Sequence, residues 1–126
     1  MKIIIGADPW GVKLKTAIVE HIEKRGIEVE DIGSHENAKR DYYAIAAEVA
    51  KAVQSKKADK GIVLCGTGMG VAIVANKLKG VNAALVEAAF AAYKAKQINN
   101  ANVLAMCGMV VSEFVALDAV DKWLDT

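Results

Sequence analysis

The sequence predicts an α/β protein, a Rossmann-like three-layer αβα sandwich around a five-stranded parallel sheet. Five short apolar runs alternate along the chain with five segments whose apolar residues recur at helical spacing. Continuous apolar strands with intervening helices are typical of a parallel sheet covered on both faces. The 126 residues contain no linker, long-period repeat or low-complexity tract, so we expect one domain over residues 1–126.

The predicted strands differ in how deeply they are expected to lie in the molecule. The first, "KIIIGA", is a short β-branched run, and the second, "IEVEDIG", alternates apolar and acidic residues as a half-exposed strand does. The third, "KGIVLCG", is apolar enough to be a buried strand. The five strands are expected at residues 2–7, 27–33, 60–66, 81–87 and 101–108.

Each predicted strand is followed by a segment with helical periodicity. In the first of these segments Leu14, Ile18 and Ile22 recur at helical spacing, and Gly26 ends the helix. The last segment is amphipathic, with Ser112 as its expected N-cap. The four helices after the first are expected at residues 42–57, 69–80, 88–99 and 112–126.

The composition limits the kinds of partner that the chain can have. Its net charge is +1, with both signs mixed along the sequence, which indicates neither a nucleic-acid partner nor a membrane-surface partner. No apolar run has transmembrane length, and the apolar part of the N-terminus is too short for a signal peptide. The two cysteines form no CxxC pair and are too few for a disulfide framework, so we expect a cytoplasmic protein without a bound metal.

Ligands of open α/β sheets bind beyond the carboxyl ends of the strands, near a topological switch point. This rule selects three short segments, each directly at the end of a predicted strand. They are residues 6–8, 65–70 and 107–108. The candidate functional residues are therefore sought in these three places.

Cys65 ends the third predicted strand and begins the glycine turn "CGTGMG". The turn is neither a P-loop nor the dinucleotide pattern GxGxxG, because its glycines are evenly spaced. One interpretation is a tight turn with Cys65 as a small buried apolar residue. The other is that the glycines let an anion approach the backbone amides, with Cys65 as a reactive base or nucleophile.

Asp8 and the asparagines of "QINNANVL" also have two interpretations each. Asp8 is either an N-cap of the following helix or a carboxylate that faces a ligand, and both can hold. Asn99 and Asn100 are residues common in turns, but two adjacent side-chain amides can also hold sugar hydroxyls. Cys107, at the end of the fifth strand, is interpreted as an apolar filler.

Taken together, these segments resemble the family of ribose-5-phosphate isomerase B and the galactose-6-phosphate isomerase subunits. The similarity rests on "IIIGADPWG", "RDYYAIAAEVAKAV", "GIVLCGTGMGVAIVANKLKG" and "NNANVLAM", which cover nearly the whole chain in the family's order. Members of this family are small α/β sandwich proteins that form dimers, often assembled into tetramers. They interconvert aldose and ketose phosphates without a metal or another cofactor.

The resemblance implies a role for each residue of the glycine turn. Cys65 would be the base that moves a proton between C1 and C2 of a sugar through a cis-enediol(ate). Thr67 and the backbone amides of the turn would hold the enediolate oxygen and sugar hydroxyls. The glycines concerned are Gly66, Gly68 and Gly70.

The resemblance also assigns the other polar candidates to substrate binding. Asp8 would bind near the ring oxygen or the hydroxyls of a sugar, and Asn99 and Asn100 would hold the substrate. The expected partners are therefore a small sugar or sugar phosphate and a second copy of the chain, in a homodimer or tetramer.

The sequence departs from the family pattern at residues that usually open the sugar ring or bind phosphate. Pro9 follows Asp8 where a histidine is usual, and Ile98 replaces the histidine before the asparagines. Asn82 stands where the family has an arginine, and the arginine that the family often has near Met109 is missing. The chain stops at Thr126, before the family's tail with histidine and arginine.

These departures leave three functions open. The chain is an isomerase homo-oligomer for a substrate that needs no ring opening or binds its anion differently. Alternatively, it is the cysteine-bearing subunit of a galactose-6-phosphate-type hetero-oligomer, or a sugar-binding protein without turnover.

Overall fold

The computed structural model describes residues 1–126 and contains one five-stranded sheet in the order β2-β1-β3-β5-β4. All neighbouring strands run parallel, so the α/β class predicted from the sequence is confirmed. The strands are β1 (Lys2–Ala7), β2 (Glu28–Asp31), β3 (Lys60–Cys65), β4 (Ala83–Leu85) and β5 (Val103–Cys107). The helices are the 3-10 helix η1 (Pro9–Gly11), α1 (Val12–Lys24), α2 (Tyr42–Gln54), α3 (Met69–Ala75), α4 (Ala89–Asn99) and α5 (Glu113–Leu124).

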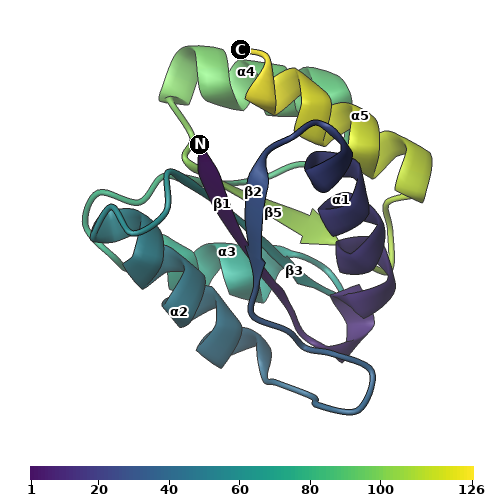
Figure 1. Cartoon of the computed structure of the whole chain (residues 1–126). Helices are drawn as coiled ribbons and strands as arrows, with labels where there is room; N and C mark the ends of the chain where they lie inside the picture. The colour runs from purple at the N-terminus through teal and green to yellow at the C-terminus, as the bar shows by residue number, and fades with distance from the viewer.

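Helices cover both faces of the sheet, which gives the three layers expected from the sequence. Helices α1, α4 and α5 lie on one face, and α2 and α3 on the other (Figure 1). Two apolar clusters fill the spaces between the layers, one on each face. The larger contains Ile3, Leu64, Leu104 and Trp123, and the smaller contains Val63 and Cys65 among others.

The strand order places the carboxyl ends of β1, β3 and β5 side by side. The chain leaves β1 toward β2 at one edge of the sheet and then returns to form β3 on the other side of β1. Ala7 pairs with Leu64, and Cys65 pairs with Cys107, so Asp8 follows directly beside the end of β3. This reversal is the topological switch point at which α/β sheets bind ligands.

The third helix and the fourth strand are both shorter than the sequence predicted. Helix α3 ends at Ala75 rather than at residue 80, and β4 spans three residues. Asn76 explains the early end, because its side-chain amide donates to the carbonyl of Ala83 (2.8 Å) and accepts from the Ala83 N–H (2.7 Å). These two bonds tie the helix end to the edge strand and take the place of further helical turns.

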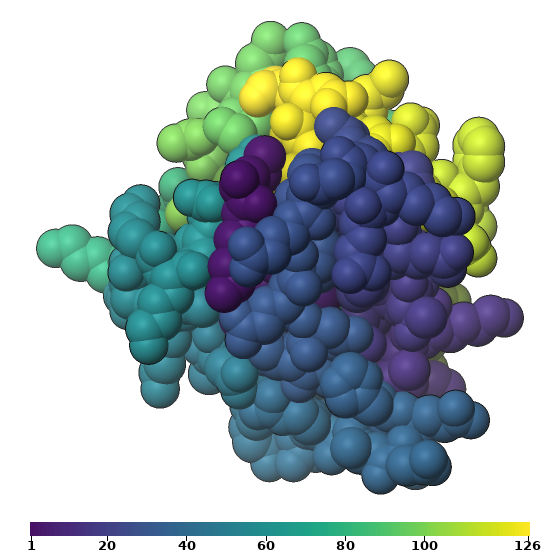
Figure 2. Space-filling view, viewed as in Figure 1, coloured from purple at the N-terminus to yellow at the C-terminus, as the bar shows by residue number.

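The edge strand β2 and helix α1 form much of the surface seen in Figure 2. Lys15 of α1 is buried beneath this surface, 1% exposed, and its ammonium lies 2.6 Å from Asp31 of β2. A buried charge is tolerated when it is paired in this way. The pair accordingly fixes α1 against the exposed edge of the sheet.

A charged cluster joins α1 to α5 on the outside of the sandwich. Asp121 lies 2.8 Å from His21 Nε2 and accepts a hydrogen bond from Arg25 (2.7 Å), whose other terminal nitrogen bonds Asp125 (2.6 Å). Burial alone would raise the pKa of the Asp121 carboxyl. The hydrogen bonds from Arg25 and His21 outweigh burial and hold that pKa below its ordinary value.

We expect Asp121→Asn to lower the free energy of unfolding by about 1 kcal/mol at pH 7. Because the pKa is lower in the folded chain, ionised Asp121 stabilises the fold above the ordinary aspartate pKa of about 3.9. This stabilisation is lost as the pH falls through the folded-state pKa. Urea unfolding of both proteins at pH 7 and pH 3 measures the difference, and an equal difference at both values would contradict the assignment.

Candidate active site

Cys65 lies at the carboxyl end of β3, and its sulfur faces the turn that follows. The Gly68 N–H donates to Cys65 Sγ at 3.1 Å, and the side chain is 6% exposed. A backbone N–H directed at sulfur stabilises negative charge on it. Cys65 also belongs to the same apolar cluster as Val63 and Val71 on the α2–α3 side of the sheet. Cys65 is therefore a core residue whose sulfur lies beside a backbone amide donor.

Thr67 is an exposed residue of the turn, two residues after Cys65. Its Oγ1 accepts a hydrogen bond from the Met69 N–H at 3.3 Å, where α3 begins. The hydroxyl proton is left to donate outward. A group that donates from this position suits an oxygen that carries negative charge.

Two glycines of the turn lie close against side chains of neighbouring segments. A Cβ atom on Gly66 would lie 2.7 Å from the sulfur of Met109, and one on Gly70 would lie 2.7 Å from the ring of Tyr42. The tight-turn interpretation of these two glycines therefore has a physical basis in the fold itself.

Gly68 is the most constrained position of the turn. Its φ is +77°, and an added Cβ would lie 2.5 Å from Leu85 Cδ1 and 3.0 Å from the Met106 carbonyl oxygen. This left-handed conformation directs the Gly68 N–H at Cys65 Sγ. The sulfur contact therefore depends on a conformation that glycine adopts readily.

We expect Gly68→Ala to lower the free energy of unfolding by about 2–4 kcal/mol, from left-handed strain and overlap with the Met106 backbone. Gly80→Ala is the matched control, because Gly80 has φ +88° and nothing within 4 Å of an added Cβ. The control should lose only about 1–2 kcal/mol, the cost of the left-handed conformation. Chemical unfolding measures the free energy of unfolding of both variants. Equal losses of this free energy would show that the neighbours of Gly68 move to accept the added methyl group and that the overlap adds nothing.

Asp8 caps the 3-10 helix, as one of its two interpretations predicted. Its Oδ1 accepts from the Trp10 N–H at 2.9 Å, and its own N–H donates to the Leu64 carbonyl at 3.0 Å. Burial raises the pKa of the Asp8 carboxyl, and hydrogen bonds from the Trp10 and Gly11 amides only partly oppose this. The capped carboxylate thus stands at the strand end next to Cys65.

Asn99 and Asn100 lie at the other edge of the sheet from Cys65 within one chain. Helix α4 runs back across the sheet and ends at Asn99, just before β5 begins at Val103. Strand β5 then spans about 13 Å to Cys107, which is paired with Cys65. The structure therefore does not bring these asparagines to the Cys65 turn of their own chain, since a helix between parallel strands ends at their amino edge.

Exposed apolar side chains lie at the carboxyl end of the sheet, the end that carries the Cys65 turn, and form an apolar rim that was not anticipated from the sequence. Its members are large apolar side chains that follow a strand or begin a helix, and all are at least 41% exposed. They are Trp10, Tyr42, Met69, Met109, Val110 and Phe114. Exposed apolar residues at helix starts, where polar caps are usual, were the signal in the sequence. Several exposed apolar side chains at one end of a sheet are typical of an interaction surface.

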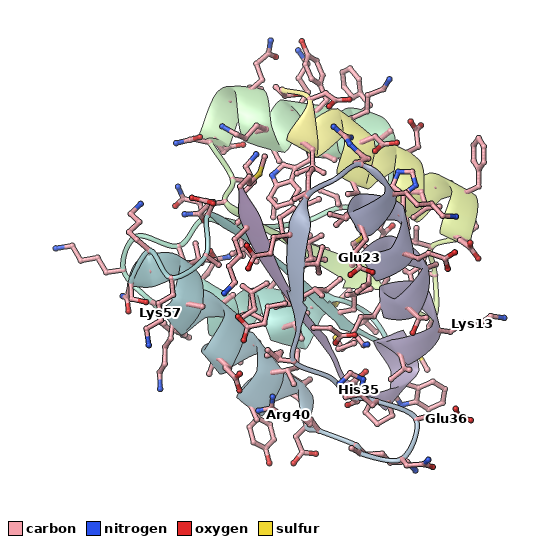
Figure 3. The ribbon with its side chains drawn as sticks, in the orientation of Figure 1. Lys13, Glu23, His35, Glu36, Arg40 and Lys57 are labelled. Atoms are coloured by element: carbon pink, nitrogen blue, oxygen red, sulfur yellow. The ribbon has the colours of Figure 1, made fainter.

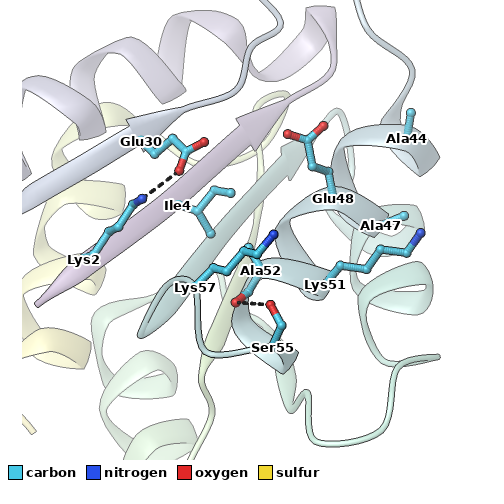
Figure 4. Close-up of a pocket in the computed structure, with 10 residues that line it drawn as sticks. All are labelled: Lys2, Ile4, Glu30, Ala44, Ala47, Glu48, Lys51, Ala52, Ser55 and Lys57. Atoms are coloured by element: carbon cyan, nitrogen blue, oxygen red, sulfur yellow. Dashed lines mark hydrogen bonds and ion pairs between the residues drawn. The ribbon is translucent and has the colours of Figure 1, made fainter.

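The two largest hollows of the surface lie away from this turn. A groove of about 670 Å³ runs between α2 and the start of β1, lined by Ile4 and by charged groups such as Lys2 and Glu30, which pair at 3.0 Å (Figure 4). The second hollow lies between α1 and the β2–α2 loop. It is lined by Lys13 of α1 and by His35 and Glu36 of the loop (Figure 3). The paired charges in the first groove leave it without a strong preference for an ion of either sign.

Neither a metal site nor a membrane span is formed by these residues. No three His, Cys, Asp or Glu side chains come together in a way that could hold a metal ion. None of the helices combines the length and the apolar character needed to cross a bilayer.

A parallel α/β sandwich with polar groups and a cysteine at the switch point defines a class of small-molecule enzymes and binding proteins. The family model described as Ribose/Galactose Isomerase matches residues 3–126, and the chain belongs to that family. The resemblance seen in the sequence and the assignment to the isomerases are thereby confirmed.

Similar proteins agree with this membership over the whole chain. Ribose-5-P isomerase B of Listeria innocua is 40% identical over 126 residues, which cover 100% of this chain and 85% of that protein. D-erythrulose-4-phosphate isomerase of Pectobacterium atrosepticum is 35% identical, over 99% of this chain and 83% of that protein. The structure of Clostridium thermocellum ribose-5-phosphate isomerase B has a TM-score of 0.96 and 45% identity, with 100% of this chain and 85% of that chain covered.

Proposed function

We propose that the protein interconverts an aldose and a ketose, as the free sugar or its phosphate, through a cis-enediol(ate), with Cys65 as the base. The observation that carries this proposal is the Cys65 sulfur, which lies at the switch point of the sheet and accepts the Gly68 N–H at 3.1 Å. A sulfur in that setting can hold the negative charge that a base needs. Membership of an isomerase family favours this use of it over a purely structural one.

The proposed reaction moves one proton between neighbouring carbons. The Cys65 thiolate removes the proton from the carbon next to the carbonyl, the electron pair of that C–H bond forms a C=C bond, and the π pair of the carbonyl moves to its oxygen. The proton of the neighbouring hydroxyl then passes to this oxygen. The thiol returns its proton to the former carbonyl carbon, and the deprotonated oxygen becomes the new carbonyl. Thr67 and the turn amides of Gly66 and Gly70 stabilise the enediolate oxygen between the two steps, while the Gly68 N–H stays on the Cys65 sulfur.

Asp8 is proposed to bind a hydroxyl of the same substrate. Its carboxylate stands at the end of β1, next to the end of β3. One oxygen is held by the Trp10 amide, so the carboxylate is fixed in orientation. A fixed acceptor of this kind suits recognition of a sugar hydroxyl.

Asn99 and Asn100 are proposed to hold the substrate in the active site of a second copy of the chain, within a homodimer. Their own Cys65 lies at the other edge of the sheet, while Ile98 beside them is 70% exposed and apolar. The apolar rim at the Cys65 end of the sheet is a complementary surface for Ile98. In a two-fold dimer each copy would place this helix end on the other's rim, which forms two equivalent sites.

Mixing two inactive variants tests the shared site. Cys65→Ala and Asn99→Ala proteins, denatured and refolded together in equal amounts, should recover about a quarter of the wild-type activity, because half of the dimers contain one intact site. Each variant refolded alone is the control. Absence of recovery, with mixed dimers shown to form, would overturn the shared site.

The substrate class is a small sugar or sugar phosphate of four to six carbons. A panel of tetrose, pentose and hexose substrates, with and without phosphate, tests the function and also separates the alternatives. Turnover by the chain alone supports the homo-oligomeric isomerase. Activity only with a second family chain favours the cysteine-bearing subunit of a galactose-6-phosphate-type pair. Binding without turnover favours the sugar-binding alternative.

We place the protein in the cytoplasm, where two unpaired cysteines stay reduced.

A further inference from the structure

Cys65 and Cys107 lie side by side at the ends of the two central strands β3 and β5. Their Cα atoms are register partners, and the Gly108 N–H donates to the Cys65 carbonyl at 2.8 Å just beyond them. Neighbouring strands are about 4.8 Å apart, which is within the Cα separation of about 4.4–6.8 Å found in disulfides. The backbone thus already has the spacing of a cross-link.

The two cysteine side chains also point to the same face of the sheet. Val63 and Ala105, two residues earlier on each strand, both belong to the apolar cluster on the α2–α3 side. Since side chains of a strand alternate between faces, Cys65 and Cys107 follow them onto that side. Both cysteines are unpaired.

The surroundings of the two sulfurs give them different reactivity. Cys65 is 6% exposed and receives the Gly68 N–H, whereas Cys107 is fully buried and its Sγ lies 3.7 Å from Glu87 Oε1. Burial, followed by the charge of Glu87, the hydrogen bond to it and the charge of Cys65, raises the pKa of Cys107 to about 11. Cys65 is therefore the first sulfur that an oxidant meets, and Cys107 is held as a thiol with a carboxylate beside its proton.

We propose that Cys65 and Cys107 form a reversible disulfide when the protein meets a hydroperoxide. The Cys65 thiolate attacks the peroxide oxygen, the O–O bond breaks, and hydroxide or alkoxide leaves while Cys65 becomes a sulfenic acid. Cys107 Sγ then attacks Cys65 Sγ, its proton passes to Glu87, and the S–O bond breaks to release hydroxide, which takes up that proton as water. Two thiols are oxidised and one peroxide is reduced.

The cross-link protects Cys65 and switches off the chemistry proposed for it. A sulfenic acid that meets a neighbouring thiol is not carried on to the irreversible sulfinic acid. Thiol exchange in a reducing compartment restores both cysteines, as is usual for cytosolic redox-sensing disulfides. The loss of isomerase activity rests on the proposed function of Cys65, whereas the disulfide itself rests only on the geometry of the pair.

Mass spectrometry of the native protein treated with hydrogen peroxide tests the disulfide directly. After alkylation and trypsin digestion, residues 61–77 and 97–122 should appear as one linked peptide pair that lacks two hydrogen atoms, and dithiothreitol should release it. Non-reducing gels should show a cross-link within one chain. A linked pair only between chains, or two free thiols under conditions that oxidise Cys65 in Cys107→Ala, would overturn the proposal.

Variants separate the roles of the two cysteines and of Glu87. In Cys107→Ala and Cys107→Ser, Cys65 should reach the sulfinic acid and dithiothreitol should no longer restore activity. Glu87→Gln should form the disulfide at least about tenfold more slowly, because the carboxylate no longer takes the Cys107 proton. Equal sulfinic acid formation at Cys65 with and without Cys107 would contradict the protective role. If the linked peptides form but activity is unchanged, the proposed function of Cys65 fails and the disulfide stands.

Discussion

Cys65→Ala should lower the rate of aldose–ketose interconversion at least about a hundredfold, the usual contribution of a positioned base. Alanine keeps the small apolar volume that Cys65 contributes to the α2–α3 cluster, so the fold should be retained. The measurement is incorporation of deuterium from D₂O at C1 or C2 of the substrates that the panel identifies. Exchange should disappear while binding of the substrate changes little.

Cys107→Ala is the matched control for this experiment. Cys107 is paired in register with Cys65 on the neighbouring strand, so its replacement disturbs the same region of the sheet. Its exchange rate should stay close to that of the wild type. Full exchange in Cys65→Ala would remove Cys65 from the role of base and leave its sulfur as a core residue beside the turn.

The largest expected effect on stability comes from Trp123, near the end of α5. Its side chain is fully buried in the larger apolar cluster, and its Nε1–H donates to the Ala101 carbonyl at 2.9 Å. The Lys60 ammonium lies 4.8 Å from the ring centre. Trp123→Ala should therefore lower the free energy of unfolding by about 3–5 kcal/mol.

Trp123→Phe distinguishes ring packing from the hydrogen bond. Phenylalanine keeps most of the apolar volume but leaves the Ala101 carbonyl without this donor, which should cost about 1–3 kcal/mol. Urea unfolding followed by circular dichroism measures both variants. A loss from Trp123→Ala no larger than that from Trp123→Phe would show that the cavity collapses and that the hydrogen bond accounts for the effect.

The polar candidates show where local reasoning succeeds and where it fails. Asp8 was expected to be a cap because the signal lies within two residues, and the structure has the cap at the Trp10 amide. Asn76 was missed, since its two bonds reach Ala83, which comes into contact with it only when the chain turns back at Gly80. The short α3 follows from that contact between elements and not from the helical propensity of residues 76–80.

The sequence by itself determined the order and type of the elements and the place of the Cys65 turn at a strand end. These depend on side-chain periodicity and on glycines, which act over a few residues. Only the tertiary structure decided that Cys107 stands beside Cys65 and that Asn99 ends at the opposite edge of the sheet from its own Cys65. Strand order causes the first outcome, because β5 inserts between β3 and β4 and so brings Cys107 beside Cys65. The second follows from the parallel direction of β4 and β5, because the helix that connects them has to end at their amino edge.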